Sequence, residues 1–224
     1  MTGTTGRITA RQFLESDGVE DWRVVGDGAC ACFRTGSVEE GSQLVRAIGE
    51  LPDINESRPD VDLRPEAVTV RLVTITANYF GLHEHHVELA RQISALARER
   101  SFPADPSAVQ SFQVTIDALI SVEVMPFWRA VLAYDYRGDT PDEDLIDPRR
   151  RGPSIWFQRM DAPRPQRNRI HVDLWVPYDQ AEARVAAAIA AGGHLVSDAH
   201  APEWWTLADA EGNEVDIATI MGRD

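Results

Sequence analysis

The feature that most constrains the fold is a pattern of strands and helices that occurs twice in the second half of the chain. Residues 112–118 alternate apolar and polar side chains, and residues 170–176 do the same 58 positions later. Alternation with a period of two is typical of a half-buried β-strand. Each segment is followed by a helical pattern and by further short strands, which end at residues 154–157 and 214–217. The sequence therefore predicts an internal duplication of a βαβββ unit.

The first hundred residues show a different order of elements. Two predicted strands, residues 22–25 and 29–33, flank a Gly-Asp-Gly turn, and Ser37 with Glu40 forms a capping-box pattern at the start of a helix. A strand at residues 68–72 and a long helix at residues 81–100 follow. This order predicts an α+β layer.

The stretch from residue 101 to 111 has two prolines and little apolar periodicity, which is typical of a linker. A chain of 224 residues is long enough for two domains of ordinary size. We therefore expect an α+β domain at residues 1–102, a linker at 103–110 and a second α+β domain, the duplicated one, at 111–224.

Charge and hydropathy exclude several classes of partner. The formal net charge of −14 would repel a nucleic-acid backbone, and no apolar run approaches the roughly 18 residues of a membrane span. The first ten residues lack the apolar core of a secretory signal, so we expect a cytoplasmic protein. Cys30 and Cys32 are one residue apart, which suits reduced core cysteines better than a disulfide.

The duplicated pattern, together with the sequence Asp-Ala-Glu-Gly-Asn at residues 209–213, resembles the glyoxalase and bleomycin-resistance branch of the vicinal oxygen chelate superfamily. In that superfamily the first and last strands of each copy supply ligands to one metal in a cupped sheet. The matching positions here are Gln113, Trp156, His171 and Asp216. Since an indole cannot bind a metal, the resemblance implies a site of Gln113, His171 and Asp216 for a divalent Zn, Mn, Fe or Ni ion.

The other interpretation of the same resemblance is a cup that has lost its metal. Trp156, Trp175, Trp204 and Trp205 are then candidates for stacking on a planar ligand, and Arg149 and Arg151 for binding an anionic group. The same residues also suit plain core packing and a solvated loop.

The first half is similar to the pterin-4a-carbinolamine dehydratase family, which removes water from 4a-hydroxytetrahydrobiopterin. The paired strands within residues 22–33, Arg58-Pro59 before the strand at 68–72, and the segment 81–93 carry this resemblance. The family uses a His-His-Pro motif and a further histidine, but here these positions read Ser57-Arg58-Pro59 and Ile75. An arginine does not exchange protons near neutral pH, so the resemblance implies a degenerate pterin site.

Three histidines, His83, His85 and His86, lie at the start of the predicted long helix. They do not form the His-Glu-x-x-His pattern of zinc proteases. His83 and His86 are one turn apart, so they could share a metal or relay a proton. Exposed histidines on a helix surface are the alternative interpretation.

Three functions remain open from the sequence. The first is a small-molecule-binding protein or enzyme whose main site is the glyoxalase-like cup, with a planar or aromatic ligand and a degenerate first half. The second is a lyase, a hydro-lyase acting on a carbinolamine through an altered residue set. The third is a non-catalytic dimerisation or interaction module. No catalytic residue is assigned, and we expect a homodimer.

Overall fold

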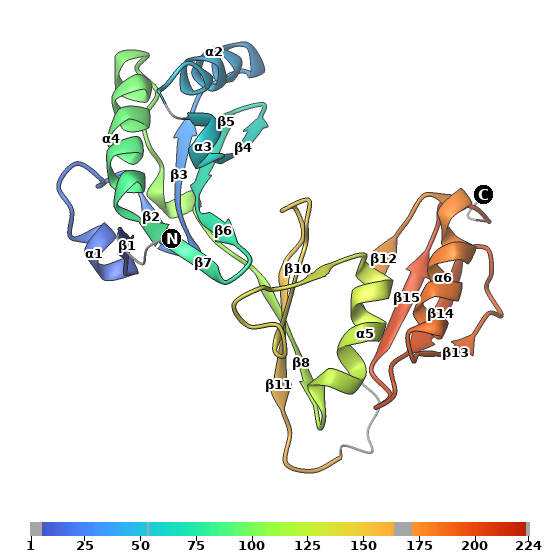
Figure 1. The fold of residues 1–224 in the computed structure, drawn as a ribbon. Coiled ribbons are helices and arrows are strands. Elements are labelled where there is room, and N and C mark those ends of the chain that lie inside the picture. Colours follow the sequence, from blue (N-terminus) through green and yellow to red (C-terminus); the bar gives the residue numbers. More distant parts are fainter. Residues whose placement is uncertain (1–5, 53, 164–171, 223–224) are drawn as a thin grey trace. The chain divides into compact units, whose positions relative to one another are not determined.

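The computed structural model describes residues 6–52, 54–163 and 172–222, and the chain divides into two compact units, Met1–Ser111 and Phe112–Asp224 (Figure 1). Both units mix helices and strands, as the sequence predicts. Within the described residues, no helix combines the length and apolar character needed to span a bilayer.

The first unit contains a four-stranded antiparallel sheet and a second, three-stranded sheet. The larger sheet has the order β2 (Arg23–Val25), β3 (Gly28–Arg34), β5 (Ala67–Leu72), β4 (Asp60–Arg64). The smaller one has the order β1 (Arg7–Ile8), β7 (Tyr79–His83), β6 (Thr74–Thr76). The helices are α1 (Ala10–Leu14), α2 (Val38–Gly49), α3 (Ile54–Ser57), α4 (Glu84–Glu99) and the short 3-10 turn η1 (Pro106–Ala108).

Local sequence signals explain much of this unit. Val68, Val70 and Leu72 are fully buried on β5, which confirms the predicted alternating strand. The Ser37 hydroxyl accepts a hydrogen bond from the backbone N–H of Glu40 at 3.2 Å, which confirms the predicted start of α2. Cys30 and Cys32 are buried and not disulfide-bonded, and burial raises the pKa of the Cys30 thiol to about 11.

One boundary prediction was wrong. The long helix begins at Glu84 and not at residue 81, because residues 79–83 form β7. This strand pairs with β1 on one side and β6 on the other, and these non-local hydrogen bonds outweigh the helical pattern of the sequence. Strands β4, β6 and β7 had no counterpart among the predicted elements.

The second unit consists of two βαβββ modules. The first module contains β8 (Gln113–Ala118), α5 (Ser121–Leu132), β9 (Asp135–Tyr136), β10 (Asp144–Ile146) and β11 (Ser154–Arg159). The second contains β12 (Asp173–Trp175), η2 (Tyr178–Gln180), α6 (Ala181–Ala190), β13 (His194–Ser197), β14 (Trp204–Ala208) and β15 (Glu214–Ala218). Their strand orders, β8-β11-β10-β9 and β12-β15-β14-β13, correspond strand for strand, with the first and last strands parallel in each. The predicted duplication is confirmed.

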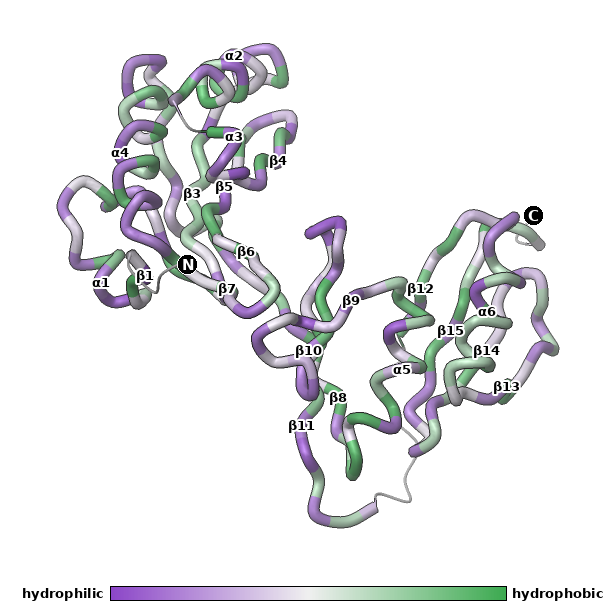
Figure 2. Tube along the Cα trace, viewed as in Figure 1, coloured by the Kyte–Doolittle hydropathy of each residue, from purple (hydrophilic) through white to green (hydrophobic). Residues whose placement is uncertain are grey.

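Both modules share one hydrophobic core. Its members come from α5, from α6 and from one face of each sheet, and Figure 2 shows hydrophobic stretches along β8, α5 and β15. They include Phe127, Trp128, Ile116, Phe157, Leu207 and Ile217. Since side chains alternate along a strand, the other face of each sheet points away from this core. We call these two surfaces the open faces.

Candidate functional site

The open face of the first module carries Gln113, Thr115 and Trp156. Val114 and Ile116 of β8 pack against the core, whereas Gln113 and Thr115 are exposed. The strand register places Trp156 beside Thr115 on one side and Asp144 on the other. The arrangement therefore exposes an aromatic side chain among polar neighbours.

Trp156 also lines the wall of a cavity. The cavity has a volume of about 500 Å³ and is bounded by the start of α5 and by charged groups of both signs, with the lining Leu119, Ile120, Ser121, Val122, Asp142, Glu143, Trp156, Phe157 and Arg159. Ligand pockets typically measure about 300–1,000 Å³. This cavity is therefore large enough for a small organic molecule.

The open face of the second module holds two rows of side chains across three strands. In one row Asp173, Asp216 and Thr206 are neighbours, and the Thr206 hydroxyl donates a hydrogen bond to Asp216 Oδ1 at 2.6 Å. In the next row Ala218 lies between Trp175 and Trp204. A carboxylate row thus adjoins a pair of indoles.

The two indoles differ in exposure and contacts. Trp175 is 54% exposed, while Trp204 is half-buried and stacks on His200 with the ring centroids 4.1 Å apart. Ala218 is only 1% exposed, so neighbouring side chains cover its methyl group. A flat ligand would therefore meet aromatic surface on this face.

The structure describes two of the three predicted metal ligands, Gln113 and Asp216. Gln113 lies on the open face of the first sheet and Asp216 on that of the second, and the common core separates the two sheets. His171 lies outside the described residues. Among the described residues, no group of three or more His, Cys, Asp or Glu side chains is placed to hold a metal ion.

Two residues that the sequence predicts to bind a ligand, Trp205 and Arg149, make contacts within the second unit. Trp205 pairs with Ile217 and packs partly buried against the core, so the indole that lies on the open face is its neighbour Trp204. Arg149 donates through Nε to Asp147 Oδ1 at 2.8 Å and through Nη2 to the Leu132 carbonyl at 3.3 Å. Arg149 therefore secures its loop against the end of α5.

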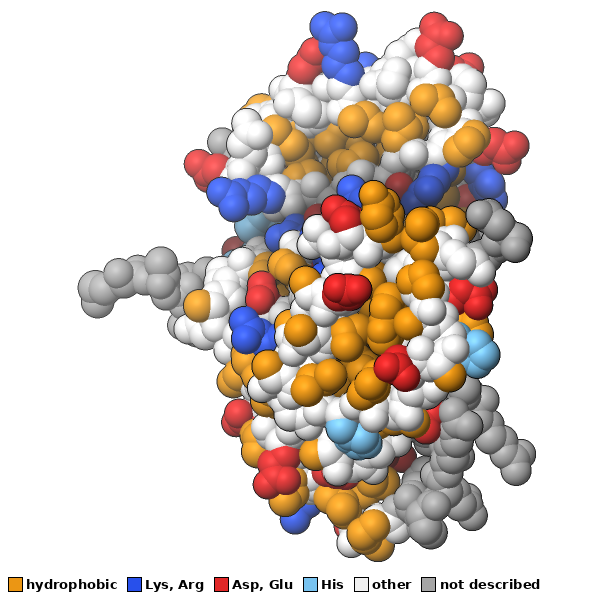
Figure 3. All heavy atoms as spheres, turned by 90° about the vertical axis from the view of Figure 1, so that its right-hand side faces the viewer, with side chains coloured by type: hydrophobic (Ala, Val, Ile, Leu, Met, Phe, Trp, Pro, Cys, Tyr) orange, Lys and Arg blue, Asp and Glu red, His pale blue; other side chains and the backbone are white. Residues whose placement is uncertain are grey.

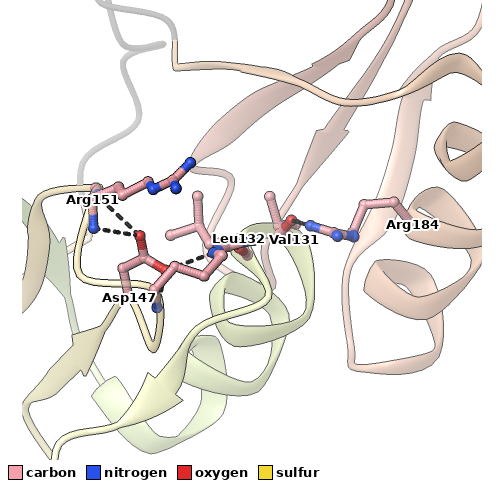
Figure 4. Close-up of polar contacts among 7 residues, drawn as sticks. Val131, Leu132, Asp147, Arg151 and Arg184 are labelled. Atoms are coloured by element: carbon pink, nitrogen blue, oxygen red, sulfur yellow. Dashed lines mark hydrogen bonds and ion pairs between the residues drawn. The ribbon is translucent and has the colours of Figure 1, made fainter.

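Figure 4 shows this region around the end of α5. The Arg151 backbone N–H donates to Asp147 Oδ2 at 3.0 Å, and the Arg184 side chain donates to the Val131 carbonyl at 2.7 Å. The last carbonyls of a helix lack partners within the helix, and here Arg149 of the basic loop and Arg184 of α6 bind the carbonyls of Leu132 and Val131. Arg149 thus has a capping role that the sequence did not indicate.

Sequence reasoning also missed the role of Asp147. Burial pushes its pKa up, but hydrogen bonds from the Gly152 N–H, the Arg149 side chain and the Arg149 and Arg151 N–H groups outweigh this effect and hold the pKa at about 2. Asp209 of the second module likewise accepts from the N–H groups of Glu211 and Asn213, each at 2.9 Å. Both aspartates directly follow the third strand of their module, which is the sequence signal that could have revealed the pair.

Glu211 connects the two modules. Its carboxylate accepts hydrogen bonds from the backbone N–H groups of Leu119 and Ile120, at 2.7 and 3.0 Å, just before α5 begins. The hairpin of the second module therefore caps the helix of the first. Leu119 and Ile120 also line the cavity beside Trp156.

The pterin-like positions of the first unit lie on separate elements. Ser57 ends α3, and Arg58 follows it with a φ of 44° and donates through Nε to the Asn55 carbonyl at 3.4 Å. Pro59 precedes β4, while Ile75 lies half-buried on β6. Of these side chains, only that of Arg58 carries a charge.

The three histidines do not fit the expectation of exposed groups on a helix surface. His86 is fully buried, His83 is half-buried at the end of β7, and only His85 is exposed. Their ring centroids lie 4.2 to 6.5 Å apart.

Apolar side chains are also exposed on the outer strand of the second module. Leu195 and Val196 of β13 are 41% and 46% exposed, and Ile189 of α6 is 42% exposed. Figure 3 shows hydrophobic side chains spread over the face of the molecule that it presents. The second unit therefore exposes aliphatic side chains on β13 and α6 in addition to the tryptophans of its open faces.

Comparisons with known proteins identify the second unit. Residues 113–218 match the model of a glyoxalase-like domain, which confirms the resemblance predicted for this half. No curated protein matches the chain. The resemblance predicted for the first half stays a prediction.

Solved structures of similar fold match about half of the chain. A hypothetical protein of S. aureus is 12% identical with a TM-score of 0.39, over 50% of this chain and 94% of that one. A glyoxalase/bleomycin resistance protein/dioxygenase family enzyme from Burkholderia phytofirmans is 17% identical with a TM-score of 0.38, over 49% and 97%. The fosfomycin resistance protein FosX from Mesorhizobium loti is 10% identical with a TM-score of 0.38, over 50% and 94%.

Proposed function

We propose, from the glyoxalase-like domain at residues 113–218, that this chain binds a small planar aromatic molecule on the open faces of its two sheets. The observation that carries the proposal is the row in which Ala218 lies between Trp175 and Trp204. Indole faces bind flat rings by stacking, and these are on the side of the sheet that the core leaves uncovered. Trp156 gives the first sheet a similar aromatic surface beside the cavity.

The charges beside the indoles favour a positively charged ring. Every charged residue in β12, β14 and β15 is acidic, and these residues are Asp173, Glu214 and Asp216. Carboxylates attract a cation, and an indole face adds a cation–π contribution of about 0.5–2 kcal/mol. A neutral or anionic ring should bind more weakly at this face.

We also propose that the binding cup is completed by a second copy of the chain. The two open faces point away from their common core, so one chain alone does not enclose a ligand between them. The exposed indoles Trp156 and Trp175 would be covered if the first sheet of one copy faced the second sheet of the other. A mass of twice 24.9 kDa in light scattering would support this arrangement, and a strictly monomeric protein would exclude it.

Such a dimer also offers a way to assemble the implied metal site. Gln113 of one copy would then approach Asp216 of the other, with His171 as the third predicted ligand. Stoichiometric metal that disappears in His171→Ala would support an enzyme of the lyase type. Metal-free protein that still binds aromatic ligands would support a binding protein.

Fluorescence and calorimetric titration with three matched probes tests the main proposal: N-methylquinolinium, quinoline and a quinoline carboxylate. We expect Trp175→Ala and Trp204→Ala to weaken binding of the cation about tenfold, because one stacked ring contributes about 1–3 kcal/mol. Tyr178→Ala, which removes an aromatic side chain that is 64% exposed but outside the strands, is the control. Failure of all three probes to bind, or equal binding by the tryptophan variants, would overturn the proposal.

The two alternatives remain predictions with simple assays. A hydro-lyase would accelerate water loss from a 4a-hydroxytetrahydropterin, and a rate equal to the uncatalysed background would exclude it. A dimerisation or interaction module would retain a partner through α4 and bind none of the probes.

A further inference from the structure

His83, His85 and His86 of the first unit form a closely packed cluster around the buried ring of His86, and the proposed function does not use it. The backbone N–H of His83 donates a hydrogen bond to Nδ1 of His86 at 3.2 Å. Because Nδ1 accepts, the proton of this neutral imidazole is on Nε2. Nε2 is buried and has no hydrogen-bond partner among the described residues. His86 is therefore held in place by a contact that only its neutral form can make.

Charged neighbours make protonation of this cluster more difficult. The ring of His85 lies 4.2 Å from that of His86, and the ring of His83 lies 6.5 Å away. Burial, followed by the charges of His85 and His83, lowers the pKa of His86 to about 3. Burial and Arg7 on β1 lower the pKa of His83, and partial burial and His83 lower that of His85. Glu84 acts in the opposite direction and raises the pKa of His83.

The cluster lies where the N-terminal segment attaches to the rest of the unit. Arg7 and Ile8 of β1 pair with His83 and Leu82 of β7, and the Glu84 N–H donates to the Gly6 carbonyl at 2.7 Å. The Arg7 guanidinium lies over the Tyr79 ring at 4.0 Å from its centroid. A strand of two residues has little stability of its own, so these contacts depend on the position of β7 and of the start of α4.

We propose that acidification releases residues 6–8 from β7 and from the start of α4, while the four-stranded sheet and the buried Phe13 of α1 stay in place. A second proton on His86 would place an N–H at Nδ1, opposite the N–H of His83. Two donors cannot bond each other, so the charged ring leaves its buried position and the first turn of α4 opens. The pairing of β1 with His83 is lost with it. This proposal for the first unit does not rest on the ligand binding proposed for the second unit.

The pH range follows from the direction of the shifts. We call the state with β1 paired to β7 the closed state, and the state with β1 released the open state. The pKa of His86 is near the ordinary histidine value of about 6.5 in the open state, and it is lower in the closed state. A lowered pKa means that the closed state is stable above about pH 6.5 and loses stability as the pH falls toward the closed-state value. At pH 5.0 one such proton favours opening by about 30-fold.

Hydrogen exchange of the full chain at pH 7.5 and 5.0, corrected for the intrinsic pH dependence, tests this proposal. We expect the amides of residues 6–8 and 79–88 to exchange about 30-fold faster at pH 5.0. Peptides covering β3 and β5 should keep their protection. Equal protection of residues 6–8 at both pH values would overturn the proposal.

Three variants identify the responsible group. His86→Gln keeps a hydrogen-bond acceptor but does not titrate, so it should abolish most of the pH effect, and an unchanged effect would overturn the proposal. If the His86→Gln variant is already open at pH 7.5, the His85→Gln variant provides the test. His85 is exposed and takes no part in the hydrogen bond between His83 and His86. Its replacement should alter the extent of opening at pH 5.0 by several-fold. No alteration in His85→Gln would then overturn the proposal. His194→Gln, an exposed histidine of β13, is the control and should match the unmodified protein.

Discussion

In each βαβββ module, the loop between the last two strands contains an aspartate that accepts hydrogen bonds from the backbone. The two loops differ in the side chains to which these aspartates are bound. In each loop an aspartate accepts hydrogen bonds from backbone N–H groups that follow it, Asp147 in the first module and Asp209 in the second. Asp209 also accepts from Trp128 Nε1 at 2.9 Å and is fully buried, whereas Asp147 is bound by the Arg149 side chain of its own loop. The second loop is therefore attached to the common core through a buried indole, whereas the first is attached to the end of α5 through Arg149.

Removing the anchored carboxylate should have the largest effect on stability. We expect Asp209→Ala to lower the free energy of unfolding by about 4 kcal/mol, because the Trp128 Nε1–H and two backbone N–H groups lose their acceptor and each such loss costs about 1–3 kcal/mol. Urea unfolding measures this effect. Asp198→Ala, on an exposed turn, should change it by less than about 0.5 kcal/mol. Equal effects of the two variants would show that the second loop is no better anchored than the surface.

The adjacent indoles of β14 test which face of the sheet belongs to the core. Trp205→Ala should cost about 3 kcal/mol of unfolding free energy, since its ring packs partly buried beside Ile217. Trp204→Ala, on the open face, should cost about 1 kcal/mol. Paired urea titrations compare them, and a larger loss in Trp204→Ala would reverse the assignment of the two faces.

Asp147→Asn should show a smaller and pH-dependent loss, about 2 kcal/mol at pH 7. The pKa of Asp147 is about 2 in the folded protein and about 3.9 in the unfolded chain. The stabilisation is therefore complete above about pH 4 and is lost as the pH falls through 2. Urea unfolding from pH 7 to pH 2.5 should show the difference between the two proteins constant at first and then decreasing. A difference that grows on acidification would contradict the role assigned to this carboxylate.

Among the residues that the structure describes, the cap that Glu211 provides has no counterpart in the first module, and its removal should have the smallest effect. Glu211→Ala should cost about 1 kcal/mol, as expected for the loss of a helix N-terminal acceptor. Glu211→Gln keeps one acceptor oxygen and should lose less. Thermal unfolding of the two variants measures the difference, and identical melting temperatures would indicate that the hydrogen bonds contribute nothing.

The sequence predicted those parts of the fold that depend on local periodicity. Val68, Val70 and Leu72 alternate with polar residues, and they are buried on one face of β5. The duplicated modules followed from the same period repeated in the same order. The strand β7 was missed because its residues have a helical pattern, and only pairing with β1 and β6 makes them a strand.

The candidate site was less predictable, because it depends on register and on distant contacts. Trp204 and Trp205 are adjacent, so a shift of one residue in the pairing with β15 decides which of them packs against the core. Arg149 reaches a carbonyl 17 positions earlier, a contact that no local pattern contains. The alternation of apolar and polar residues along each strand predicts which side chains lie on an open face. It does not predict how the open faces of the two sheets are oriented relative to each other.

The hydrogen bonds between Glu211 and the start of α5 have a consequence for biosynthesis. The Leu119 N–H and the Glu211 carboxylate are 92 positions apart in the chain. The first module therefore emerges from the ribosome long before the acceptor for its own helix has been translated. We conclude that the start of α5 acquires its final hydrogen bonds only after the second module has been translated, even though the first module contains a complete set of strands.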